Sequence, residues 1–94
     1  MYKVTIFNHS GQPIQSLSIT SQYNKKQLTD VADSQMILLN LFAPFNKKVQ
    51  LTVKQPEHIS SITFTLEGLM PIKRMNQLEI MPDGTIKHGE LGLK

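Results

Sequence analysis

Apolar and polar residues alternate with a two-residue period along most of this 94-residue chain. The pattern begins at Tyr2, Val4 and Ile6, which are separated by polar residues. Because successive side chains of a β-strand point to opposite faces, this period is typical of a strand that buries one face. The alternation returns over residues 14–21, 37–41, 49–53, 62–66 and 78–80, and a last strand is expected to begin at Ile86. The chain is therefore predicted to be all-β.

The segment NHSGQP, residues 8–13, separates the first two alternating runs. Asn8 and Ser10 have short polar side chains that can bond to nearby backbone groups, and Gly11 tolerates a positive φ. Pro13 restricts φ where the second run begins. We interpret this segment as a hairpin connection rather than as a site.

Seven strands are predicted, at a spacing of roughly 8 to 14 residues, and this pattern favours an antiparallel sandwich or barrel. The clearest turn is Pro82-Asp83-Gly84, which suits a type I turn followed by a bulge. The Asn-x-Ser-Gly turn between two strands and the closing Pro-Asp-Gly-x-Ile hairpin resemble the layout of small immunoglobulin-like or transthyretin-like sandwiches. That resemblance concerns architecture, and such folds host unrelated functions. The expected core comprises Val4, Ile6, Leu17, Ile19, Leu39, Leu51, Val53, Ile62, Phe64, Leu66 and Ile80.

Residues 30–42 have two interpretations. The alternation over residues 37–41 favours a strand. A helix is the alternative, with Asp30 as N-cap and with Val31, Leu38 and Phe42 on one face. The choice matters because it changes the number of chain reversals.

Length and composition limit the function classes. A chain of 94 residues is expected to form one domain, residues 1–94, around a single small core. The absence of cysteine excludes disulfides, thiolate metal ligands and a cysteine nucleophile. The longest aliphatic run, Met36 to Leu39, is far shorter than the ~18 residues of a membrane span, so no membrane association is expected. Without a signal-like segment at the start, a cytoplasmic location is the default expectation.

Strand parity predicts which loops lie together, because successive antiparallel strands alternate in direction. With seven strands, residues 9–13, 43–48 and 68–76 share one end, and residues 22–34, 55–58 and 82–84 share the other. The first end then carries four cations and no acid, whereas Lys25 and Lys26 are grouped with four acids at the second end. The predicted molecule is dipolar.

The first end supplies the predicted partner-binding residues. Exposed aromatic, Met and Arg side chains are enriched in protein interfaces, and Met adapts to irregular surfaces. The predicted set is Phe45, Lys47, Lys48, Met70, Ile72, Lys73 and Arg74. In the alternative interpretation, Phe45, Met70 and Ile72 fold inward to close the core, and the lysines are merely solvated.

No catalytic or metal-binding pattern is found. Parity places His9 and His58 at opposite ends, which excludes a three-histidine metal site. Ser10 follows His9, but adjacent side chains do not face each other as a nucleophile and its base must. No pair of acids is placed for acid/base chemistry, so neither an enzyme nor a cofactor is expected.

These observations predict a small non-catalytic protein-binding module, of accessory or inhibitor-like type, that contacts an acidic surface on another protein. One alternative is a nucleic-acid-binding β-domain, in which the lysine pairs contact phosphates while Tyr23 or Phe45 stacks on a base. The other is a structural or self-assembling component that pairs through an exposed edge strand, such as residues 2–8.

Overall fold

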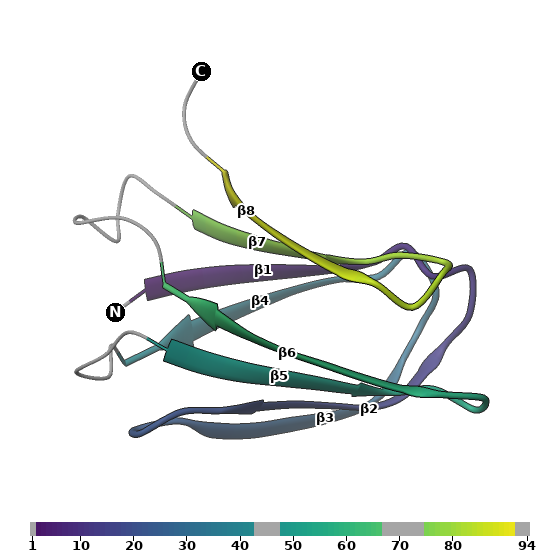
Figure 1. The fold of residues 1–94 in the computed structure, drawn as a ribbon, viewed down its shortest axis with the longest axis horizontal. Helices are drawn as coiled ribbons and strands as arrows, with labels where there is room; N and C mark the ends of the chain where they lie inside the picture. The colour runs from purple at the N-terminus through teal and green to yellow at the C-terminus, as the bar shows by residue number, and fades with distance from the viewer. Residues whose placement is uncertain (1, 43–47, 67–74, 92–94) are drawn as a thin grey trace.

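The computed structural model describes residues 2–42, 48–66 and 75–91, which form two four-stranded sheets packed as a sandwich (Figure 1). The all-β sandwich prediction is thus confirmed, with eight strands in place of seven. The strands are β1 (Tyr2–Asn8), β2 (Ile14–Thr20), β3 (Lys25–Val31), β4 (Met36–Leu41), β5 (Lys48–Lys54), β6 (Ile59–Thr65), β7 (Met75–Ile80) and β8 (Ile86–Leu91).

The strand order is β4-β1-β7-β8 in one sheet and β3-β2-β5-β6 in the other. All neighbouring strands are antiparallel except β1 and β7, which run parallel with Lys3 opposite Met75. Because β1 has a neighbour on each side, the suggestion that residues 2–8 form an exposed edge strand is wrong. The edge strands are β4 and β8 in the first sheet, and β3 and β6 in the second.

The additional strand is β3, which lies within the segment 22–34 that was expected to be a loop. Its sequence, KKQLTDV, lacks clear alternation because β3 is an edge strand and most of its side chains are exposed. Leu28 and Val31 still pack on the core. Backbone pairing to β2, with Leu28 opposite Leu17, makes the segment a strand despite its polar composition.

Residues 30–42 form no helix, so the helical alternative is wrong. Val31 ends β3, a turn follows, and Met36 begins β4. Asp30 and Ser34 adopt φ values of 55° and 66°, a left-handed conformation that interrupts a right-handed helix. The described residues contain no helix that is long and apolar enough to cross a membrane.

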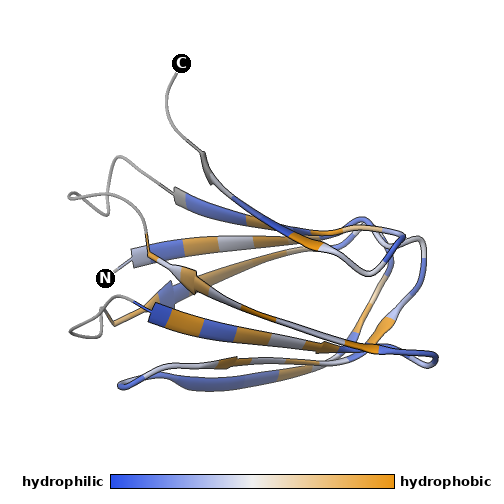
Figure 2. Cartoon of the chain, viewed as in Figure 1, coloured by the Kyte–Doolittle hydropathy of each residue, from blue (hydrophilic) through white to orange (hydrophobic). Residues whose placement is uncertain are grey.

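The core lies between the two sheets and is built from the inward-facing residue of each alternating pair. Figure 2 shows hydrophobic and hydrophilic residues alternating along several of the strands. The predicted core residues are buried, except that Leu39 and Ile62 are only partly buried. Both lie on edge strands, which have a neighbour on one side only. The core also includes Tyr2, Ile14, Val31, Leu41, Val49 and Leu78.

The predicted turn chemistry at NHSGQP is confirmed, but its interpretation as a hairpin connection is wrong, because β1 and β2 belong to different sheets and do not pair. The Asn8 side chain donates to the carbonyls of Gln12 (2.8 Å) and Ala32 (3.0 Å), and its Oδ1 accepts from the Ser10 hydroxyl (2.6 Å). Gly11 has a φ of 81°, as expected. The Gln55 amide donates to the Ser10 hydroxyl (2.8 Å), so three connections are joined by one buried polar network.

The final hairpin also forms as predicted. The Gly84 N–H donates to the Met81 carbonyl (3.0 Å), and Gly84 has a φ of 86°. A Cβ at this position would lie 3.1 Å from His58 Nε2, a tight contact that adds to the preference for glycine set by the positive φ. The connection 81–85 is thereby packed against the connection between β5 and β6.

The eighth strand changes which loops share an end. Connections 9–13, 32–35, 55–58 and 81–85 lie together at what we name the Asn8 end (Figure 1). The opposite end, named the Asn24 end, contains the 21–24 turn, the last residues of β4 and the first residues of β3 and β5. The predicted grouping of residues 9–13 with Lys48 is therefore wrong, and residues 43–47 lie outside the described residues. The prediction that His9 and His58 lie at opposite ends is also wrong, since both lie at the Asn8 end.

Candidate partner-binding surface

Of the predicted partner-binding residues, the structure describes Lys48. It begins β5 at the Asn24 end, where it is exposed and lies opposite Thr65 on β6. The other members of the set lie outside the described residues: Phe45, Lys47, Met70, Ile72, Lys73 and Arg74. The described residues that flank these segments, Phe42, Leu66 and Met75, lie at the Asn24 end with Lys48.

The Asn24 side chain joins the β2–β3 turn to the end of β4. Its amide nitrogen donates to the Phe42 carbonyl (2.7 Å) and to the Ser21 hydroxyl (2.6 Å). Its carbonyl oxygen accepts from the Phe42 N–H (2.9 Å). Asn24 is only 6% exposed, so both backbone groups of Phe42 are satisfied by one buried side chain. The end of one sheet is thus attached to a turn of the other.

This attachment places two exposed aromatic residues near each other. Tyr23, next to Asn24 in the chain, is 51% exposed, and Phe42 is 56% exposed. Asparagine is well suited to the joining position because one amide both donates and accepts hydrogen bonds, and the two partner groups here are a backbone N–H and C=O. The aromatic side chains are therefore held on an ordered backbone.

Exposed lysines lie at the same end of the molecule as these aromatic residues. Lys25 and Lys26 are exposed at the start of β3, immediately after the turn, and Lys25 lies opposite Thr20. Lys48 begins β5, two strands away in the same sheet. Loop parity predicted that Lys25 and Lys26 lie at the same end as the acids, and this prediction is wrong. The two lysines begin β3 at the Asn24 end, whereas Asp30 lies near the end of β3, at the Asn8 end.

Several of the acidic side chains that the structure describes lie at the Asn8 end. Asp33, Glu57 and Asp83 are exposed in three of its connections. The Thr85 hydroxyl (2.6 Å) and its backbone N–H (2.9 Å) both donate to Asp83, and they lower the pKa of that carboxyl below its ordinary value. Asp83 therefore stays ionised in more acidic solution than an isolated aspartate would.

A histidine and a glutamate lie within hydrogen-bond distance on the outer face of the first sheet. His9 Nδ1 lies 3.1 Å from Glu79 Oε2, and the His9 ring packs on Phe7 with centroids 5.3 Å apart. Glu79 also accepts a hydrogen bond from Gln77 (3.3 Å). Both members of the pair are partly exposed, which is typical of a surface interaction that stabilises the fold weakly.

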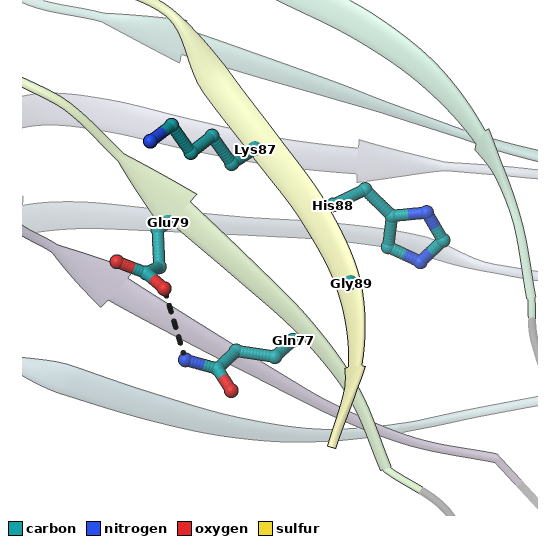
Figure 3. A pocket seen from close by; sticks show the side chains of 5 residues that line it. All are labelled: Gln77, Glu79, Lys87, His88 and Gly89. Atoms are coloured by element: carbon teal, nitrogen blue, oxygen red, sulfur yellow. Dashed lines mark hydrogen bonds between the residues drawn. The ribbon is translucent and has the colours of Figure 1, made fainter. Parts of the chain in front are cut away.

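The same carboxylate borders a shallow hollow of about 150 Å³ between β7 and β8. Its lining side chains are Gln77, Glu79, Lys87 and His88, and Gly89 forms part of its floor (Figure 3). The His88 ring projects away from Glu79 and Lys87, and its Nε2 lies 3.1 Å from Asn76 Oδ1. Lys87 and Glu79, which both line the hollow, are directly opposite each other in the β7–β8 ladder.

Residues 2–42, 48–66 and 75–91 were searched for clusters of side chains that could bind a metal ion. Within these ranges, no group of three or more histidine, aspartate or glutamate side chains is positioned to hold an ion. Comparison of the chain with protein-family models, with curated proteins and with solved structures gave no match. Any assignment of function therefore depends on the surface chemistry of this chain.

The predicted partner-binding set did not include Tyr23, Asn24 and Phe42, although the nucleic-acid alternative named Tyr23. Their signal was the Ser-Gln-Tyr-Asn segment 21–24, which separates two runs of strand length and therefore marks a hairpin turn. Treating residues 22–34 as one loop hid that turn. Recognising the hairpin would also have moved Lys25 to the correct end.

Proposed function

We propose that this protein is a non-catalytic protein-binding module that contacts an acidic surface of its partner through the Asn24 end. The observation that carries the proposal is the Asn24 attachment, because it holds exposed Tyr23 and Phe42 at the end that also carries exposed Lys25, Lys26 and Lys48. Aromatic side chains contribute much of the binding energy in protein interfaces, and surrounding charges increase the association rate.

The charge distribution of the described residues supports an acidic partner. Lysines begin β3 and β5 at the Asn24 end, whereas Asp33, Glu57 and Asp83 are at the opposite end. A partner with an acidic surface is attracted to the Asn24 end and repelled by the Asn8 end. The Asn24 hydrogen bonds also support binding, because an ordered backbone loses less conformational entropy in the complex.

Nucleic acid is the second candidate partner, and the position of β3 favours it. Tyr23 lies two residues from Lys25, and the described acids of the Asn8 end are a strand length away. Stacking of a base on tyrosine with nearby lysines on phosphates is the arrangement of many single-strand-binding surfaces. Its affinity would decrease steeply with salt.

The test is site-specific photo-crosslinking in cells, with benzoylphenylalanine introduced at Tyr23 and, as a control, at Glu57 of the Asn8 end. We expect position 23, and not position 57, to crosslink an acidic protein. Binding of that protein, once purified, is then measured by calorimetry. The Lys25→Glu/Lys26→Glu variant is expected to bind about tenfold or more weakly, because two attractive contacts become repulsive.

A matched variant, Lys54→Glu/Lys87→Glu, changes the net charge equally but away from the Asn24 end and is expected to bind as the wild type does. Equal weakening in both variants, or crosslinks of equal yield from both positions, overturns the proposal. Fluorescence anisotropy with a labelled 20-nucleotide oligothymidine tests the second candidate. Tight binding that is lost in the Lys25→Glu/Lys26→Glu variant would replace the protein partner with nucleic acid.

A further inference from the structure

Within residues 2–42, 48–66 and 75–91, the edge strand β4 differs from the other sheet edges in its lack of protection. Its sequence, MILLNL, has no charge and no proline, and Met36 and Leu38 are 50% and 63% exposed. Natural edge strands are usually protected by charges, bulges or covering segments. β4 is therefore a surface that can accept another strand.

Each of the other edge strands has a protective feature of this kind. β3 contains Lys25, Lys26 and a left-handed Asp30. β8 contains Lys87 and Gly89. β6 is uncharged, but it contacts β8 across the sandwich, and the rings of Phe64 and His88 lie 4.8 Å apart.

The hydrogen-bonding phase of β4 is set by its pairing with β1. The Asn8 N–H donates to the Gln35 carbonyl (3.0 Å), whereas the His9 N–H donates to Ile80 at the end of β7 (2.8 Å). Even-numbered residues of β1 thus direct their backbone N–H and C=O groups toward β4. Bonded and non-bonded pairs alternate along an antiparallel ladder, so Met36, Leu38 and Asn40 direct their N–H and C=O groups toward the open side.

We infer that β4 pairs antiparallel with β4 of a second copy of this chain, about a two-fold axis at Leu38. In this register Leu38 faces Leu38 of the second copy, and Met36 faces Asn40 in both directions. Every residue that directs backbone groups outward is then in a bonded pair. The arrangement is isologous and closes on itself, so it predicts a dimer and not a fibre.

Side-chain chemistry supports a second copy as the occupant. No charged residue of β4 meets its own symmetry mate, because β4 has none. A hollow of about 180 Å³ lined by Lys3, Leu38, Leu39 and Asn40 lies where Met36 of the second copy would approach. Methionine is flexible enough to fill an irregular hollow of this kind.

The expected dimer is weak. Pairing of one six-residue strand covers less than the roughly 800 Å² per partner of a standard interface, and we expect a dissociation constant on the order of 10 to 100 µM. Self-association is expected to change little with salt, because the paired strands are uncharged. This surface is separate from the lysines of the Asn24 end, so the inference does not depend on the proposed function.

Sedimentation velocity from about 5 µM to 1 mM tests the inference, with wild type, Leu38→Lys and Thr63→Lys compared. Leu38 and Thr63 are both exposed on edge strands, so each lysine is tolerated by the fold. We expect a concentration-dependent dimer for wild type and Thr63→Lys, and a monomer for Leu38→Lys. A monomeric wild type at 1 mM overturns the inference, as does a dimer that persists in Leu38→Lys.

The absence of cysteine allows a second test that does not depend on the lysine variant. Opposed residues of a bonded antiparallel pair have Cα atoms about 5.5 Å apart, within the range that a disulfide spans. Under oxidised glutathione, Leu38→Cys is expected to form a covalent dimer much faster than Thr63→Cys. Equal rates overturn the inference. A wild-type dimer that is retained by Lys25→Glu/Lys26→Glu separates this surface from the Asn24 end.

Discussion

Replacement of Asn24 by alanine tests how the Asn24 end is held together. The variant loses hydrogen bonds of 2.6, 2.7 and 2.9 Å to Ser21 and to both backbone groups of Phe42. A typical intramolecular hydrogen bond contributes about 0.5–1.5 kcal/mol net. Because water can reach these partly buried partners, we expect the free energy of unfolding to fall by about 2–3 kcal/mol.

That loss is a large fraction of the stability of a domain of this size, which is about 5–14 kcal/mol. The measurement is urea denaturation followed by circular dichroism, with the slope of free energy against urea expected to be unchanged. The control is Asn40→Ala, an exposed asparagine on β4, which is expected to change stability by less than about 0.5 kcal/mol. If the two variants differ by less than about 1 kcal/mol, the hydrogen bonds of Asn24 do not hold this end together.

The remaining predictions concern the Asn8 end. Asn8→Ala removes a buried side chain that makes four hydrogen bonds, and we expect a loss of about 2–4 kcal/mol in urea denaturation. Gly84→Ala forces a side chain into a left-handed, crowded position and is expected to cost about 1–2 kcal/mol, whereas Gly89→Ala, with open space at its Cβ, is expected to be near neutral. Thr85→Val is expected to raise the pKa of Asp83 toward its ordinary value in an NMR titration. Since that pKa is lowered in the folded state, the stabilisation by Thr85 is present above the ordinary carboxyl pKa and is lost as pH falls through the folded pKa. An unchanged titration curve for Asp83 would exclude the Thr85 contribution.

Much of the fold could be predicted from local pattern. The alternation at Val4 and Ile6, and the glycines at 11 and 84, indicate strands and turns because side-chain direction and positive φ are local properties. β3 could not be found in this way. As an edge strand it buries little, and its pairing with β2 is a long-range interaction that its own sequence does not indicate.

The candidate surface was predictable only in part. A basic, partly apolar group of loop residues was predicted, and Lys48 is its described member. The candidate surface also contains Tyr23, Phe42, Lys25 and Lys26, which were not in the predicted set. One missed strand reversed the parity of every later connection relative to the first. An error of a single strand thus misplaces the later loops relative to the 9–13 connection.

The sequence by itself determined the all-β class, most of the core and the chemistry of the tight turns, because each depends on a few neighbouring residues. Only the tertiary structure decided that β1 lies between β4 and β7, that β4 is left as an unprotected edge, and that Asn24 joins Phe42 across the two sheets. These arrangements depend on which strands are paired. Pairing is decided by the burial of all the apolar faces together, and no single stretch of the chain contains that information.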